Sequence, residues 1–158
     1  MYIVRHIGWW ALAMALAFTA GAQSREQVNW LTFEQLSDSL DAQPKPVLIS
    51  LHTDWCSYCR KMDQEVYTHP EVTKAISERY YAVKFDAETT DTVRFDGQVF
   101  ANSRATSRRR AFHDLALILG SRGHRFSVPV TIVLDEEFNV VSRHFDYLDS
   151  KKMLAILE

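Results

Sequence analysis

Apolar residues recur in short runs along the chain, and polar or turn-forming residues separate these runs. Val47–Leu51 (VLISL) and Val130–Leu134 (VTIVL) are continuous and rich in β-branched residues, which is typical of buried strands. Tyr80–Asp86 (YYAVKFD) alternates between apolar and polar positions and predicts a further strand. Val140–Phe145, which follows a turn at DEEFN, predicts another. The pattern indicates a central sheet.

Helical periodicity fills the segments between these strands. Thr32–Ala42 opens with a Thr-x-x-Gln capping box and places Phe33, Leu36 and Leu40 on one face. The helix predicted from about Arg109 to Leu119 is expected to end at Gly120, a residue type that often caps helix C-termini. The other predicted helices are Cys56–Tyr67, Pro70–Arg79 and Ser150–Leu157.

The polar segment Glu88–Arg110 has no helical period. Within it, VRF-DG-QVF predicts a small hairpin with Asp96-Gly97 as its turn. Long loops in compact domains are often functional, so we place partner specificity in this segment as a hypothesis. The basic residues Arg104 and Arg108–Arg110 are interpreted as a solvated loop face, with a patch for phosphate or an acidic partner as the alternative.

The N-terminus has the layout of a secretory signal. The uncharged run Ile7–Ala22 follows Arg5 and ends in the small-x-small sequence Ala-Gly-Ala. This run is shorter than the roughly 18–20 apolar residues that a membrane span needs. We therefore expect residues 1–22 to be a cleaved signal peptide and residues 23–158 to be a single periplasmic domain. An uncleaved membrane anchor is the alternative.

The amino-acid composition excludes few further classes of function. The 158 residues are 47% hydrophobic and 24% charged, which is ordinary for one soluble globular domain. A formal net charge of -2 gives no support for nucleic-acid binding. We expect a monomer.

The only two cysteines, Cys56 and Cys59, lie in TDWCSYCRKM, after a buried strand and at a predicted helix start. They close too small a loop to constrain the unfolded chain much, which disfavours a structural role. A helix N-terminus stabilises a thiolate and can lower its pKa to roughly 3.5–7.5, so the pair suits disulfide exchange. Zinc normally takes four ligands, and His52 would bring this site only to three. A zinc or copper site stays open as the alternative.

The predicted order of elements, β-α-β followed by a helix, a β-hairpin and a terminal helix, is the thioredoxin arrangement. Residues 47–59 (VLISLHTDWCSYC) and Val128–Thr131 (VPVT) resemble the thioredoxin superfamily. More narrowly, TDWCSYCRKMDQEVYTHPEV is similar to the C-terminal thioredoxin-like domain of DsbD-type transmembrane reductases and to exported thioredoxin-related proteins. The resemblance covers about residues 45–158. It implies an α/β fold with a central mixed sheet flanked by helices, and a hairpin-containing insertion at about 88–110 before the cis-proline strand.

The resemblance also implies a role for each site residue. Cys56 would be the nucleophile and Cys59 the resolving thiol of a redox-active disulfide, with no organic cofactor and no metal. Val128 and Pro129 would form a cis-proline loop that offers backbone groups to the substrate, and Trp55 would pack beside the nucleophile. The implied substrate is a disulfide-bearing protein, and the implied electron donor is a membrane carrier.

Several positions depart from the pattern of the superfamily. Ser50 stands where many thioredoxins place a buried acid that assists proton transfer, and Ala82 falls near the place of that acid's lysine partner. Water, Asp54 or Glu65 would then move the proton. The Ser57-Tyr58 dipeptide leaves the direction of electron flow open. A reductase is the main expectation, and an oxidase or isomerase, or a non-catalytic binding or metal module, are the alternatives.

Overall fold

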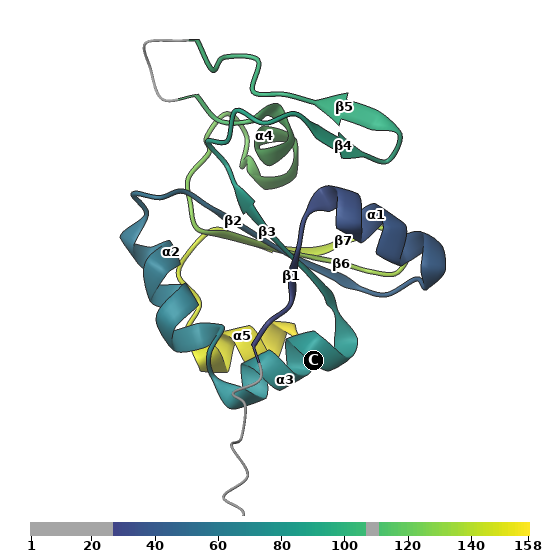
Figure 1. Cartoon of the computed structure of the whole chain (residues 1–158). Helices are drawn as coiled ribbons and strands as arrows, with labels where there is room; N and C mark the ends of the chain where they lie inside the picture. The colour runs from purple at the N-terminus through teal and green to yellow at the C-terminus, as the bar shows by residue number, and fades with distance from the viewer. Residues whose placement is uncertain (1–26, 107–110) are drawn as a thin grey trace, which may run out of the picture.

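A five-stranded sheet lies at the centre of the molecule, in the order β1-β3-β2-β6-β7 (Figure 1). The computed structural model describes residues 27–106 and 111–158. The predicted signal peptide, the start of the helix predicted from Arg109, and the basic run Arg108–Arg110 lie outside the described residues. The strands of this sheet are β1 (Trp30–Leu31), β2 (Val47–His52), β3 (Tyr81–Asp86), β6 (Val130–Leu134) and β7 (Val140–His144).

The central strand β2 runs parallel to β3 and antiparallel to β6, so the sheet is mixed as predicted. Its residues Val47 to Leu51 are all buried, because helices cover both faces of the sheet. The two-residue strand β1, which pairs with Ala82 and Val83, is too short to have produced a recognisable alternation in the sequence.

Two hydrophobic clusters occupy the two faces of the sheet. On one face, α1 (Phe33–Ala42) and α4 (Asp114–Gly120) pack against alternate residues of β2, including Ile49 and Leu51. On the other face, α3 (Pro70–Arg79) and α5 (Ser150–Ile156) pack against Leu48 (Figure 1). Within the described residues no helix is both long and apolar enough to cross a membrane.

Most predicted helices are confirmed, with two changes. The capping box of α1 is present, because the Thr32 hydroxyl accepts a hydrogen bond from the Gln35 amide at 3.2 Å, and the Gln35 side-chain oxygen accepts one from the Thr32 amide at 2.9 Å. The helix predicted over Cys56–Tyr67 is in fact α2 (Ser57–Lys61) followed by a π-helical turn, Met62–Val66. Cys56 is the N-cap of α2 rather than a residue within it.

Helix α4 begins later than predicted. The described residues 111–113 are not helical, and α4 starts at Asp114 because the His113 side chain caps it. The imidazole Nδ1 accepts a hydrogen bond from the Leu115 amide at 3.2 Å, and Nε2 lies 3.1 Å from the Asp91 carbonyl oxygen. A buried histidine in this capping position is not one of the usual N-cap residue types, so the pattern gave no start signal.

The prediction that Gly120 forms a C-cap is wrong. Gly120 is the last residue of α4, and the cap is Ser121, whose backbone is extended at φ -78 and ψ 142. Glycine is needed here for space, because a Cβ atom would lie 2.5 Å from Leu51 Cδ1.

The predicted hairpin is confirmed as β4 (Val93–Phe95) and β5 (Gln98–Phe100). Its two turn residues, Asp96 and Gly97, have φ of 50 and 66, as a two-residue turn of the primed type requires. The hairpin packs on α1, and the Arg94 amide donates a 2.9 Å hydrogen bond to the Glu34 carboxylate.

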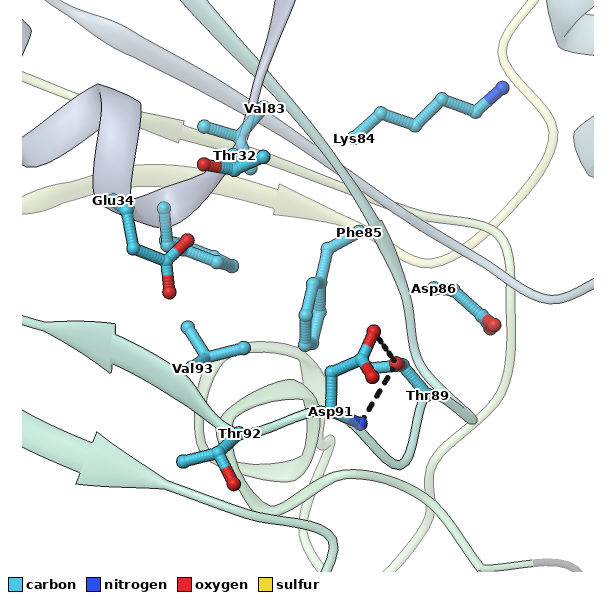
Figure 2. A pocket seen from close by; sticks show the side chains of 11 residues that line it. Thr32, Glu34, Val83, Lys84, Phe85, Asp86, Thr89, Asp91, Thr92 and Val93 are labelled. Carbon is cyan, nitrogen blue, oxygen red and sulfur yellow. Dashed lines mark hydrogen bonds between the residues drawn. The ribbon is translucent and has the colours of Figure 1, made fainter.

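A pocket of about 270 Å³ lies where this insertion meets α1 and β3 (Figure 2). Val93 and Phe85 supply apolar walls, and Glu34 and Asp91 supply acidic ones. Asp91 is held by the Thr89 hydroxyl, which donates to its carboxylate at 3.1 Å and accepts from its amide at 3.2 Å. Neither cysteine lines this pocket, so it is separate from the candidate redox site.

Candidate functional site

The strand register brings two distant loops to one end of the sheet. Strand β2 ends at His52, and the antiparallel strand β6 begins at Val130, opposite Leu51. The loop that leaves β2 and the loop that enters β6 therefore meet at this end. The first contains Cys56, and the second ends at Pro129.

Cys56 and Cys59 form a disulfide across the first turn of α2, with their Cα atoms 5.3 Å apart. The Cys59 amide donates a 3.1 Å hydrogen bond to Cys56 Sγ, so this sulfur accepts one of the otherwise unpaired N–H groups of the helix start. In this oxidised form the two residues are only 4% and 5% exposed.

Exposed aromatic rings flank the disulfide. Trp55 is 46% exposed, and its indole N–H donates a 2.8 Å hydrogen bond to Glu88 at the start of the insertion. Tyr58, between the two cysteines, is 59% exposed and lies 6.0 Å from the Tyr147 ring, measured between centroids. The Lys61 ammonium lies 5.0 Å from the same Tyr147 ring.

The second loop carries a cis peptide bond between Val128 and Pro129. Pro129 is buried, and the half-buried Val128 packs against the core cluster that contains Leu51 and Val130. Both residues thus lie at the end of the sheet that carries the cysteine loop.

A neutral hydrogen bond occupies the position of the missing acid. Ser50 is buried in β2 and accepts a 3.1 Å hydrogen bond from the Tyr67 hydroxyl. Burial raises the pKa of Tyr67 to about 12, although the hydrogen bond to Ser50 acts in the opposite direction. Tyr67 was not identified from the sequence. The available signal was Ser50 itself, because a buried strand hydroxyl needs a partner.

The position expected for the lysine partner of the buried acid is occupied by Lys84, which corrects the assignment of Ala82 to this position. In the β2–β3 register Ser50 pairs with Lys84, whereas Ala82 pairs with Leu48. The Lys84 ammonium lies 2.6 Å from the Asp63 carboxylate, in the π-helical turn. The acid that meets the lysine therefore comes from the cysteine-bearing helix instead of from β2.

The two acids considered for proton transfer lie on the surface. Asp54 is exposed, and its carbonyl oxygen accepts a 2.6 Å hydrogen bond from Arg60. Glu65 is exposed, lies 3.8 Å from the Lys61 ammonium and accepts a 3.4 Å hydrogen bond from Tyr147. Asp63 is more enclosed than either of them.

His52 is half-buried at the end of β2, opposite Asp86. Burial lowers its pKa below the ordinary value of 6.5, and the positive charge of Lys84 adds to this effect. Nearby carboxylates, including Asp63 and Asp54, oppose it. In the part of the chain that the structure describes, no group of three His, Cys, Asp or Glu side chains is placed to hold a metal ion.

Comparison with known proteins identifies relatives of this chain. A family model described as thioredoxin-like matches residues 29–135. The thiol:disulfide interchange protein DsbD of Escherichia coli K12 is 31% identical over 68 residues, which is 40% of this chain and 12% of that protein. The chain thus matches only a small part of the length of that relative.

Solved structures show the same fold at low sequence identity. A DsbH oxidoreductase is 14% identical with a TM-score of 0.56, over 83% of this chain and 82% of that chain. A thioredoxin from Thermus thermophilus is 19% identical with a TM-score of 0.57, over 83% and 85%. The reduced C-terminal domain of DsbD from Neisseria meningitidis is 17% identical with a TM-score of 0.51, over 78% and 89%.

Proposed function

Since this chain belongs to the thioredoxin-like family of thiol-disulfide oxidoreductases, we propose that it reduces disulfides of exported proteins with Cys56 and Cys59. The observation that carries the proposal is the cysteine pair at the start of α2, at the same end of the sheet as the cis Val128–Pro129 peptide. One loop supplies the reacting sulfurs, and the other supplies backbone groups for an extended substrate segment.

The reaction proceeds by two exchanges. The Cys56 thiolate attacks one sulfur of the substrate disulfide, forms a mixed disulfide and expels the other substrate sulfur as a thiolate. Cys59 then loses its proton and attacks Cys56 Sγ, which releases the second substrate thiolate and leaves the Cys56–Cys59 disulfide. Two electrons pass from the cysteine pair to the substrate, and the released thiolates take up protons. The amide N–H of Cys59, which points at Cys56 Sγ, favours the thiolate that begins this sequence.

Asp63 is our assignment for the group that takes the proton from Cys59. It lies four residues after Cys59, about one turn further along the helix that continues from α2 into the π-helical turn. Lys84, the register partner of Ser50 in the sheet, holds the Asp63 carboxylate at 2.6 Å. The Tyr67 hydroxyl is unsuited to accept this proton, because its pKa of about 12 keeps it protonated at neutral pH.

The exposed rings of Trp55 and Tyr58 offer apolar area to the substrate beside the disulfide. Exposed aromatic side chains are enriched where proteins bind protein partners, and they lose little conformational freedom on binding. We assign both rings to substrate contact, together with Val128 and Pro129. We keep His52 and Asp54 as modulators of the charge around the pair, since the Asp54 carboxylate acts on the pKa of His52 and both residues lie just before Cys56 in the chain.

The experiment that tests the reaction is insulin reduction by wild type, Cys56→Ser and Cys59→Ser. Wild type should reduce insulin, Cys56→Ser should be inactive, and Cys59→Ser should accumulate a mixed disulfide with the substrate. Equal and negligible activity in wild type and Cys56→Ser would overturn the proposal.

The direction of electron flow is tested by the reduction potential of the Cys56–Cys59 pair. A value at about -270 mV supports the reductase, and a value at about -120 mV supports the oxidase instead. Equilibration with glutathione buffers, followed by alkylation and mass spectrometry, gives this potential directly.

Export and recharging are the remaining parts of the proposal. Residues 1–22 direct the chain to the periplasm, where a membrane carrier reduces the disulfide between turnovers and the protein acts as a monomer. Expression of the full chain should give a soluble periplasmic protein whose sequence starts at Gln23. Recovery of the uncleaved chain in the membrane fraction would support the anchored alternative.

A further inference from the structure

A short hairpin precedes the cis-proline peptide, in the loop that joins α4 to β6. Arg122 and Arg125 exchange backbone hydrogen bonds, at 2.9 Å from the Arg122 amide and at 3.3 Å from the Arg125 amide. The turn between them is Gly123-His124, and Gly123 adopts a positive φ of 62 that suits glycine. This turn fixes the backbone from which both arginines project.

The hairpin borders a surface hollow of about 520 Å³. Arg122 is held over the Phe145 ring, with its guanidinium carbon 5.5 Å from the ring centroid. The Phe126 ring packs against the Phe112 ring at a tilt of 50°, with centroids 4.6 Å apart, and lines the hollow as its apolar floor. The residues that line the hollow are Arg122, His124, Arg125, Phe126, Ser127, Phe145 and Asp146.

Basic side chains dominate the rim of this hollow. Among the described residues, neither Arg122 nor Arg125 takes part in an ion pair with a carboxylate. Asp146 is the only acid among the residues that line the hollow, and its side chain is exposed. It is not paired with either guanidinium group. Each guanidinium therefore has N–H donors available for a planar carboxylate.

The hollow adjoins the substrate loop. Ser127 lines it, and the next two residues form the cis Val128–Pro129 peptide. A protein segment that lies along this peptide with its cysteine at the Cys56–Cys59 pair would thus place a neighbouring side chain in the hollow.

We propose that this hollow selects substrates that carry an Asp or Glu side chain close to the reacting cysteine, with Arg122 and Arg125 as the specificity-determining residues. The inference rests on the proposed reductase function, since it assumes that a protein disulfide is presented along the Val128–Pro129 loop. The apolar floor accommodates the methylene groups of the acidic side chain, and the two arginines bind its carboxylate.

The test uses disulfide-bridged peptides that are identical except for Asp, Asn or Lys beside the cysteine. Wild type should give the highest kcat/KM with the Asp peptide and the lowest with the Lys peptide, and salt should weaken this preference. The double variant Arg122→Gln/Arg125→Gln should lower the Asp-to-Asn ratio of kcat/KM about three- to tenfold. The matched control is Arg79→Gln, an exposed arginine at the end of α3, next to the opposite end of the sheet. It should keep the wild-type ratio.

A binding measurement separates this inference from the reaction itself. Peptides with Ser in place of Cys cannot react, and fluorescence anisotropy gives their affinity for the oxidised protein. Tighter binding of the Asp peptide, lost in the double variant, supports the specificity site even where turnover fails. Equal binding of the Asp and Asn peptides by wild type, or an unchanged ratio in the double variant, would overturn it.

Discussion

Ser50 and Tyr67 form a neutral contact at the position where a buried acid was expected. Ser50 cannot carry a charge, and Tyr67 fills the space beside it with a buried ring and a hydroxyl that reaches the serine at 3.1 Å. Such a pair is stable because each buried polar atom has a partner, and each partner becomes costly to remove alone.

Ser50→Ala should therefore destabilise the protein by about 1–3 kcal/mol, since it leaves the Tyr67 hydroxyl buried without this acceptor. Urea unfolding gives the change in the free energy of unfolding. Tyr67→Phe provides the matched control, and the double variant Ser50→Ala/Tyr67→Phe should lose less than the sum of the two single changes. Strictly additive losses would show that the two hydroxyls do not interact.

His52 should make stability depend on pH. Its pKa in the folded protein lies below 6.5, the ordinary value, so the unfolded chain binds more protons as the pH falls past that value. The contribution of His52 is therefore fully present above about pH 6.5 and is lost as the pH falls through the folded pKa. The free energy of unfolding should rise between about pH 5 and pH 7, less steeply in His52→Asn. An NMR titration that places the His52 pKa at or above 6.5 would contradict this prediction.

Candidate site residues that belong to a short sequence motif could be identified from the sequence. Residues that come together only through the pairing of strands could not. The cysteine pair and the Val128-Pro129 dipeptide each lie within a few residues of sequence, so the sequence alone marks them as candidates. Lys84 was missed because a shift of the pairing by two residues keeps the same face of β3 and is invisible in the hydrophobic pattern. Asp63 was missed with it, because the two side chains meet only when the π-helical turn packs beside β3.

Whole elements were predictable where start and stop signals are local. The capping box of α1, Pro70 at the start of α3 and the Asp96-Gly97 turn each identified an element correctly. The signals failed for α4, where the cap is the buried His113 and where Gly120 serves packing instead of termination. These two roles depend on tertiary neighbours, Asp91 and Leu51, that sequence spacing does not reveal.

Gly120→Ala should destabilise the protein even though alanine is the better helix former. The added Cβ would meet the Leu51 side chain, which is fully buried and has little room to move. Overpacking of this kind costs about 1–3 kcal/mol, against a gain of at most about 1 kcal/mol from helix propensity. Thermal or urea unfolding measures the difference.

The control is Ile118→Ala. This residue lies on the same helix at 63% exposure, so its substitution should change the free energy of unfolding by less than about 0.5 kcal/mol. Equal effects of both substitutions would exclude the packing explanation.

For the molecule as a whole, the insertion is part of the core and not an appendage. Val93 is 6% exposed within the same cluster as Phe33 and Phe85, and the Phe95 ring lies 5.1 Å from that of Phe33 and 5.4 Å from that of Phe138. Deleting the segment would therefore remove core contacts together with any partner surface. The hypothesis that it determines partner specificity is better tested at exposed positions of the hairpin than by deletion.

The same substitution at two valines of the hairpin, one buried and one exposed, tests whether the hairpin unfolds together with the core. Val93→Ala should reduce the free energy of unfolding by about 1–3 kcal/mol, because it removes buried methyl groups from the core shared by β3 and α1. Val99→Ala, at a position that is 58% exposed, should cost less than about 0.5 kcal/mol. Urea unfolding followed by tryptophan fluorescence should give one transition in both variants. A hairpin that unfolds separately would instead give a second transition in Val93→Ala, with the main transition unchanged.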